Sequence, residues 1–157
     1  MGGRESGTVS MSRIDYDRII WDRNNMGGFN NTIGVKITKA DYGYAAGELL
    51  LKEEHYNPIG AVHGGVVFTM CDTLGALAAL TKGSFATTVS GNINYMNAVR
   101  DCRKLIGEGT SLKMGKNIAV VQVMIHNENG LDLACATMTY QYLGDRVPFP
   151  YSLPDEE

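Results

Sequence analysis

The side chains best suited to chemistry in this 157-residue sequence gather between Asn57 and Asp72. Asp72 is the only charged residue between Glu54 and Lys82, and its neighbours are mostly apolar. Because an isolated carboxylate is costly to bury, it should be paired, hydrogen-bonded or unusually easy to protonate, and such a group can act as a general base near neutral pH. The alternative is a structural carboxylate that faces a subunit contact or caps a neighbouring loop.

Gly64 and Gly65 fall at the expected start of a helix, where backbone N–H groups have no intrahelical partner. Without side chains they let a ligand oxygen approach, and the helix dipole favours negative charge there, which predicts an oxyanion site. Asp72 lies eight residues after Gly64. That is about 12 Å along one helix, too far for both groups to serve one carbonyl. The spacing therefore predicts a dimer, in which Asp72 of one copy faces the glycine end of the partner's helix.

Two further polar residues precede this helix, and the sequence leaves their roles open. His63 could be a base, a ligand or a helix cap. A helical zinc motif needs a second histidine four residues on, and that place holds Val67, which disfavours a metal site. Asn57 stands before Pro58, where an asparagine is more often a turn residue than a functional one.

The elements that must position these residues can be placed by periodicity. We expect a short amphipathic helix from Ser12, as its N-cap, to about Asn24, and a long apolar helix over 63–82. The Asn129-Gly130 pair predicts a hairpin between the last two strands. Runs of strands around one helix indicate an α+β fold with an antiparallel sheet, curved enough to cover the helix on most sides. The strands are expected at 32–38, 44–51, 87–96, 104–112, 117–126 and 131–143.

Composition limits the function further. Hydrophobic residues make up 44% and charged residues 20%, as is usual for a globular domain. We expect a disordered leader at residues 1–10, one domain over 11–145 and an irregular tail at 146–157. The net charge of −3 and pI of about 5.6 argue against a nucleic-acid partner.

The cysteines and the apolar runs indicate the compartment. Cys71, Cys102 and Cys135 are widely spaced, which favours free thiols in a cytoplasmic protein over a disulfide framework or a zinc site. No apolar run reaches the roughly 20 residues that span a bilayer, so we expect no membrane partner.

The pattern Asn-x-x-Gly-x-x-His-Gly-Gly, followed by an aspartate nine residues after the histidine, resembles the hotdog-fold acyl-CoA thioesterases of the PaaI-like, phenylacetate-pathway type. The similarity runs from about Thr32 to Leu143 and includes Asn92-Ile-Asn-Tyr-Met96 after the helix. It implies a hotdog fold, in which a curved antiparallel sheet wraps one long central helix. It also implies a homodimer or a dimer of dimers (a homotetramer).

The resemblance further implies roles for individual residues. Asp72 would activate water as a general base, or attack the thioester as a nucleophile, and the Gly64 N–H would polarise the carbonyl. Asn57 would place the water or the carbonyl, and His63 would order that loop. Thr88 would assist the water, with Thr87 and Ser90 as competitors. Asn57, His63 and Gly64 would come from one chain, and Asp72 and Thr88 from the other.

Several residues are candidates for contacts with the substrate. Coenzyme A enters as part of the acyl-CoA substrate, so no metal or redox cofactor is required. Gly65 and Ser90 are candidates to contact the substrate, and Met70, like Phe68, Leu74 and Tyr95, could line an acyl pocket or pack in the core. Basic residues that could meet the CoA phosphates, or simply be solvated, are Arg100, Arg103, Lys104, Lys113 and Lys116, of which Lys116 has the most family-like setting.

The expected reaction is hydrolysis of an aryl or medium-chain acyl-CoA at a subunit interface. Two alternatives stay open. A hotdog enoyl-CoA hydratase uses a different arrangement of histidine and aspartate. A non-catalytic acyl-CoA sensor would have no need of a carboxylate beside the thioester carbonyl.

Overall fold

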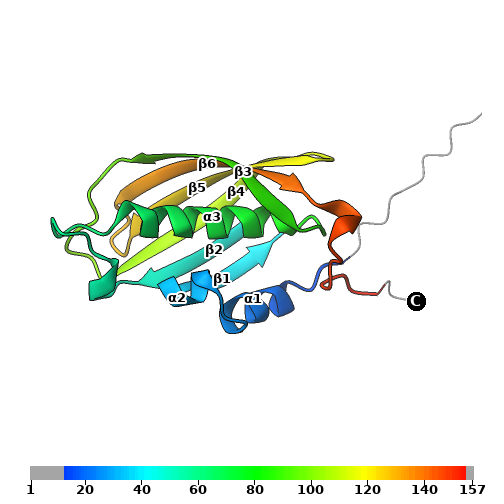
Figure 1. Cartoon of the computed structure of the whole chain (residues 1–157), viewed down its shortest axis with the longest axis horizontal. Coiled ribbons are helices and arrows are strands. Elements are labelled where there is room, and N and C mark those ends of the chain that lie inside the picture. Colours follow the sequence, from blue (N-terminus) through cyan, green and yellow to red (C-terminus); the bar gives the residue numbers. More distant parts are fainter. Residues whose placement is uncertain (1–12, 155–157) are drawn as a thin grey trace, which may run out of the picture.

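The computed structural model of the chain describes residues 13–154. The leader expected at residues 1–10 lies outside this range, as does Ser12. Six antiparallel strands form one sheet, and a long helix, α3 (Gly64–Leu80), lies across one face of it (Figure 1). The predicted α+β hotdog architecture is confirmed. In sheet order, the strands are β1 (Val35–Asp41), β2 (Tyr44–Leu50), β4 (Lys104–Met114), β5 (Ile118–Asn127), β6 (Asp132–Tyr142) and β3 (Ala86–Tyr95).

Glycines in β4 bring the central helix close to the sheet. A Cβ on Gly109 would stand 3.1 Å from the carbonyl oxygen of Leu74, and one on Gly107 would stand 2.6 Å from the Leu74 side chain. Any larger residue would push the helix outward and leave voids, which protein interiors do not tolerate well. The close approach at these glycines holds the helix against β4 and its two neighbours, β2 and β5.

One side of α3 is not covered by the sheet. The expectation of cover on most sides is confirmed, but a stripe along the helix is partly or fully exposed. We call it the open stripe; it consists of Gly65, Phe68, Thr69, Asp72, Thr73 and Ala76. The three- and four-residue spacing of these positions places them on one face of the helix.

The two edge strands of the sheet, β1 and β3, have different surroundings. At β1, Asn24 of α1 (Tyr16–Asn25) receives a hydrogen bond from the Ile37 N–H at 2.8 Å and donates one to the Ile37 carbonyl at 2.9 Å. At β3, all ten residues are at least partly exposed. An exposed edge strand of this length is a template for pairing with another chain.

The N-terminal region differs from the sequence prediction. The helix begins at Tyr16, and the cap is Asp15, whose carboxylate accepts a hydrogen bond from the Arg18 N–H at 2.9 Å. The prediction of a Ser12 cap is therefore wrong, because Asp15 stands at the correct distance to accept that N–H. A second short helix, α2 (Phe29–Ile33), was not predicted; Gly28 and Gly34 flank it with positive φ angles of 95° and 97°.

The tail contacts the N-terminal helix. Past a short 3-10 turn at Gly144–Arg146, the chain returns so that the Asp15 N–H donates to the Tyr151 carbonyl at 2.8 Å. The rings of Phe85, Phe149 and Tyr151 meet edge to face with centroids 5.3 to 6.3 Å apart. The segment is thus packed although it forms no strand. Across residues 13–154, no helix is long and apolar enough to cross a bilayer.

Candidate active site

The first turn of α3 presents one free backbone donor. His63 is the N-cap, in an extended conformation, and its Nδ1 accepts a hydrogen bond from the Gly65 N–H at 2.9 Å. The Gly64 N–H makes no hydrogen bond to any described residue. A free N–H at a helix start, next to the dipole's positive end, suits a developing oxyanion. Of the two glycines, Gly64 is therefore the donor that remains available, because the Gly65 N–H is used by the cap.

The segment before α3 is held by the side chain of Asn57 and the backbone carbonyl of His55. Asn57 Oδ1 accepts hydrogen bonds from the N–H groups of Ile59 and Ala61, both at 3.1 Å. Its Nδ2 bonds to nothing in the described part of the chain. His55, which the sequence analysis did not select, is buried, and its carbonyl accepts from the His63 N–H at 2.8 Å. Asn57 thus shapes the turn and keeps a free amide donor close to the helix start.

Two hydroxyl groups hold the Asp72 carboxylate. Thr88 Oγ1 donates to Asp72 Oδ1 at 2.7 Å, and the Tyr140 hydroxyl donates to the Asp72 carbonyl at 3.0 Å with a longer contact of 3.3 Å to Oδ1. Burial, and then the nearby carboxylate, raise the pKa of the Tyr140 phenol, which therefore stays protonated and donates. Asp72 Oδ2 has no partner among residues 13–154. Asp72 is half-buried, less than the sequence suggested.

Strand register explains which hydroxyls reach Asp72. Thr88 pairs with Tyr140 across β3 and β6, so both side chains lie on the helix side of the sheet. After Thr88 the register shifts, and Ser90 pairs with Thr139, whose side chain faces away from α3. Thr88 is therefore selected over Thr87 and Ser90. Tyr140 was missed because only this register brings it to the helix.

A glycine in α3 makes room for the phenol. A Cβ at Gly75 would stand 2.3 Å from the Tyr140 hydroxyl oxygen, a distance that no real contact shows. Gly75 lies three residues after Asp72, on the adjoining turn of the helix. The phenol can therefore reach across α3 to the carboxylate only because position 75 has no side chain.

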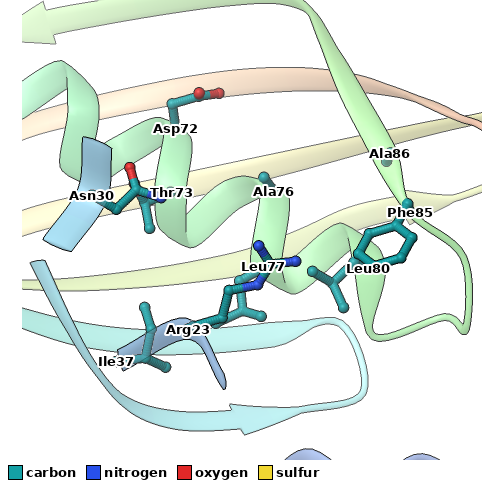
Figure 2. A pocket seen from close by; sticks show the side chains of 10 residues that line it. All are labelled: Arg23, Asn30, Ile37, Asp72, Thr73, Ala76, Leu77, Leu80, Phe85 and Ala86. Carbon is teal, nitrogen blue, oxygen red and sulfur yellow. The ribbon is translucent and has the colours of Figure 1, made fainter. Parts of the chain in front are cut away.

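A cavity of about 250 Å³ adjoins Asp72 (Figure 2). It lies between α3 and the N-terminal helices, and Arg23 of α1 and Asn30 of α2 contribute to its wall. Thr73 donates to Asn30 Oδ1 at 2.9 Å. The cavity therefore has a candidate general base at its rim and a cationic side chain in its wall.

The sequence matches the Thioesterase superfamily over residues 59–134, which contain the helix start and Asp72. Human acyl-coenzyme A thioesterase 13 is 30% identical over 103 residues, which cover 64% of this chain and 74% of the human protein. The chain belongs to the thioesterase superfamily. The prediction of a thioester hydrolase is confirmed at this level.

Solved structures of related proteins share this fold. A hypothetical thioesterase of Streptococcus pneumoniae TIGR4, solved with coenzyme A, is 28% identical with a TM-score of 0.68, over 71% of this chain and 87% of that one. Two other structures of that protein carry alanine in place of an aspartate and of a threonine 16 positions later. The Escherichia coli PaaI protein, at 19% identity and a TM-score of 0.74 over 82% of this chain and 91% of its own, shares the fold.

Three other predicted contact residues lie in different surroundings. Met70 is 0% exposed in the core, so it offers no surface to a substrate. Ser90 lies on the sheet face away from α3, because its strand pairing follows the register shift. Gly65 remains exposed beside the free donor of Gly64.

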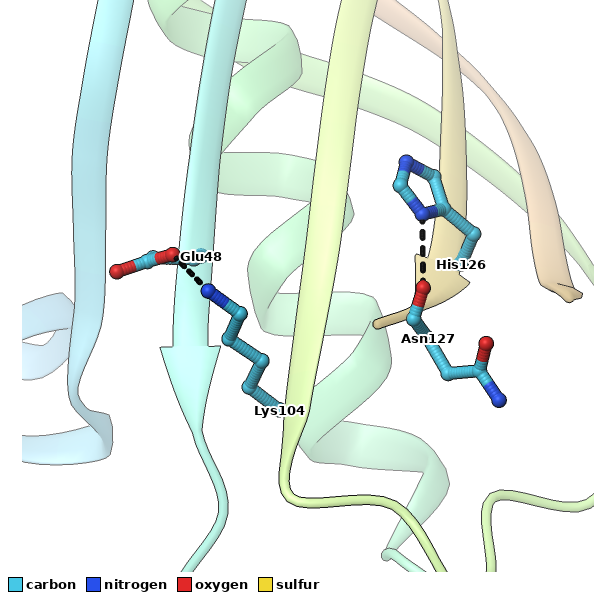
Figure 3. A network of polar contacts seen from close by, with 4 residues as sticks. All are labelled: Glu48, Lys104, His126 and Asn127. Carbon is cyan, nitrogen blue, oxygen red and sulfur yellow. Dashed lines mark hydrogen bonds and ion pairs between the residues drawn. The ribbon is translucent and has the colours of Figure 1, made fainter. Parts of the chain in front are cut away.

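The basic candidates divide between the two ends of α3. Arg100 and Arg103 follow β3 near the helix start. Lys113, near the end of β4, and Lys116, in the β4–β5 turn, lie near its other end, where Lys82 donates to the Gly115 carbonyl. Lys104 is paired with Glu48 at 2.8 Å across β2 and β4 (Figure 3), and this contact lowers the pKa of Glu48. Lys104 is therefore engaged elsewhere, and Lys116 stays a prediction.

The side chains of residues 13–154 offer neither a metal site nor a reactive buried thiol. Within the described range, no three His, Cys, Asp or Glu residues gather as a metal site. The Cys71 thiol has its pKa raised to about 12, mainly by burial, so it stays protonated. All three cysteines are free, and Cys71 and Cys102 are buried.

Replacing His63 should destabilise the helix start. His63→Ala removes the acceptor of the Gly65 N–H, so the free energy of unfolding should fall by about 1 kcal/mol. His63→Asn supplies another capping acceptor and should recover most of that loss. Urea unfolding of the three proteins measures it; equal stabilities would contradict the capping role.

Replacing Thr88 should impair turnover without unfolding the protein. Thr88→Val keeps the shape but removes the donor to Asp72 Oδ1, so kcat should fall by about ten-fold, as for loss of a hydrogen bond to a charged group. Thr87→Val, one position away on the other face of β3, is the matched control and should retain wild-type kcat. Similar losses in both variants would show that β3 is merely perturbed.

Proposed function

We propose that the protein hydrolyses acyl-CoA thioesters to a free acid and coenzyme A, with an aryl or medium-chain acyl group. The observation that carries this proposal is the Asp72 carboxylate, fixed through Oδ1 by Thr88 and Tyr140 and free at Oδ2, at the rim of a cavity. The names of the human relative and the coenzyme A in the Streptococcus structure support this substrate class. The aspartate and threonine replaced in the Streptococcus protein have the same 16-residue separation as Asp72 and Thr88.

The proposed chemistry uses the free carboxylate oxygen. Asp72 Oδ2 accepts a proton from a water molecule, whose oxygen attacks the thioester carbonyl. The carbonyl oxygen becomes an oxyanion and is stabilised by the Gly64 N–H. When the C–S bond breaks, the proton on Asp72 passes to the departing thiolate. Water supplies the hydroxyl of the product acid, so no cofactor is consumed.

The site needs two copies of the chain. Asp72 and Gly64 are separated by about 12 Å along one helix, so the oxyanion donor must come from the partner subunit. Two features of the surface favour a twofold contact: the open stripe on α3, and the unpaired edge of β3. If the two α3 helices run antiparallel across that contact, each Asp72 meets the other copy's Gly64. A dimer, or a dimer of dimers, then has paired sites.

This dimer arrangement also gives roles to Asn57 and His63. The loop that contains Asn57 adjoins the helix start, so it approaches the other copy's Asp72 together with Gly64. Asn57 can then direct its free amide toward the water or the carbonyl, while His63 holds the loop. Free thiols accord with a cytoplasmic location.

An acyl-CoA panel tests the activity. Purified protein should release free CoA from at least one aryl or medium-chain acyl-CoA, and Asp72→Asn should lower kcat by about 100- to 10,000-fold, because the general base is lost. Asp132→Asn, at an exposed carboxylate on β6, is the control and should be unaffected. Tight retention of acyl-CoA with no turnover across the panel would instead favour a binding protein.

Complementation tests the shared site. Gly64→Pro removes the N–H at the first helical position, where proline is accepted, and His63 already has the extended ψ of 131° that suits a residue before proline. Gly64→Ala is the matched control: its Cβ meets the Tyr95 hydroxyl at the same 3.1 Å, but the N–H is kept. We expect kcat to fall by about 100- to 1,000-fold in the proline variant and far less in the alanine variant.

Co-expression of this proline variant with an Asp72 variant measures whether the two chains share each site. Gly64→Pro and Asp72→Asn should each be nearly inactive alone, whereas co-expression should restore about a quarter of wild-type activity, because half the dimers carry one intact site of two. No recovery in verified mixed dimers would place both groups of each site on one chain.

A further inference from the structure

The cavity beside Asp72 contains a cationic side chain that forms no ion pair with any residue in the range 13–154. Arg23 reaches in from α1, and its guanidinium points toward Ala76 and Leu77 of α3 (Figure 2). Arg23 Nε is buried and unbonded, and in the part of the chain that is described its side chain forms neither a hydrogen bond nor an ion pair. Its charge lies over the ring of Phe85, 5.8 Å from the centroid. A desolvated donor left unpaired is unfavourable, so a ligand acceptor here would be strongly bound.

The rest of the cavity suits a short acyl chain. Its volume is about 250 Å³, and a cavity of about 150 Å³ is enough to hold benzene. Ile37, Leu77 and Leu80 supply apolar wall. An acyl group whose carbonyl lies at Asp72 would therefore run along α3 toward Arg23.

The length of that group follows from the helix. Ala76 and Leu77, next to the guanidinium, lie four and five residues after Asp72, which is about 6 to 7.5 Å along the axis. An extended chain advances about 1.2 Å per bond, so five or six bonds separate the carbonyl from the group that meets Arg23. A chain of about six carbons spans this distance.

We propose that the cavity selects acyl groups that end in a carboxylate, and that Arg23 binds this carboxylate. This proposal rests on the thioesterase function proposed above and specifies its substrate: the CoA thioester of a dicarboxylic acid of about six carbons. The guanidinium can donate two parallel hydrogen bonds to a carboxylate, which an uncharged methyl end cannot accept. α1 lies outside residues 59–134, so this selectivity is separate from the part of the chain that matches the superfamily.

Two substrates that differ only at the far end test the proposal. Wild-type protein should hydrolyse adipoyl-CoA with a higher kcat/KM than hexanoyl-CoA. Arg23→Met, which keeps the length of the side chain but removes its charge, should lower kcat/KM for adipoyl-CoA by about ten- to a hundred-fold and leave hexanoyl-CoA within about two-fold. Arg18→Met is the matched control on the same helix, because Arg18 bonds to the Pro150 carbonyl outside the cavity; it should keep the wild-type ratio.

A binding measurement separates this proposal from the proposed reaction. Calorimetry should show adipate binding more tightly to wild-type protein than to Arg23→Met, with no such difference for hexanoate. Equal losses on both thioesters, or equal binding of adipate to both proteins, would overturn the role of Arg23 while leaving the thioesterase standing. If wild-type protein turned over neither thioester nor any other in the panel, the hydrolase would fail, and adipate binding alone would decide the proposal.

Discussion

Burying a carboxylate in the middle of a helix that is covered on every side is costly, because the group loses its hydration and needs hydrogen bonds or a counter-charge in exchange. In this protein the sheet encloses α3 on all faces except the open stripe, and Asp72 lies on that stripe. The same opening admits water and a substrate, and it leaves a surface for a second copy of the chain. Thr88 and Tyr140 fix the carboxylate from the covered side, so position and access are set by one packing arrangement.

At the start of α3, the adjacent N–H groups of Gly64 and Gly65 have different roles. His63 accepts the Gly65 N–H and thereby orders the turn, which leaves the Gly64 N–H as the unused donor. A helix start without a cap would present several competing donors and a frayed backbone. The preceding loop adds rigidity, since the buried His55 accepts from the His63 backbone. Preorganised donors of this kind contribute most to stabilising a transition state, because they need not reorient as charge develops.

Sequence alone predicted the elements that have strong local signals: the long apolar helix, the strands with alternating burial, and the Asn129-Gly130 hairpin. It failed where a local choice had competitors, as at the Asp15 cap and the short α2 helix. The site residues between Asn57 and Asp72 were visible because they are close in the chain. Tyr140 and Arg23 were not, because each meets the site through tertiary packing, and the choice of Thr88 over its neighbours depends on an irregular register with β6.

Gly75 links the interior packing to the reactive group. Alanine is normally preferred to glycine inside a helix by about 1 kcal/mol, so the helix gives up intrinsic stability at this position. A methyl group there would overlap the Tyr140 oxygen, and either the phenol or the helix would have to move. Both movements change the orientation of a carboxylate three residues away. A substitution that improves helix propensity and stays out of the substrate's path would thus still change the reactivity of the carboxylate.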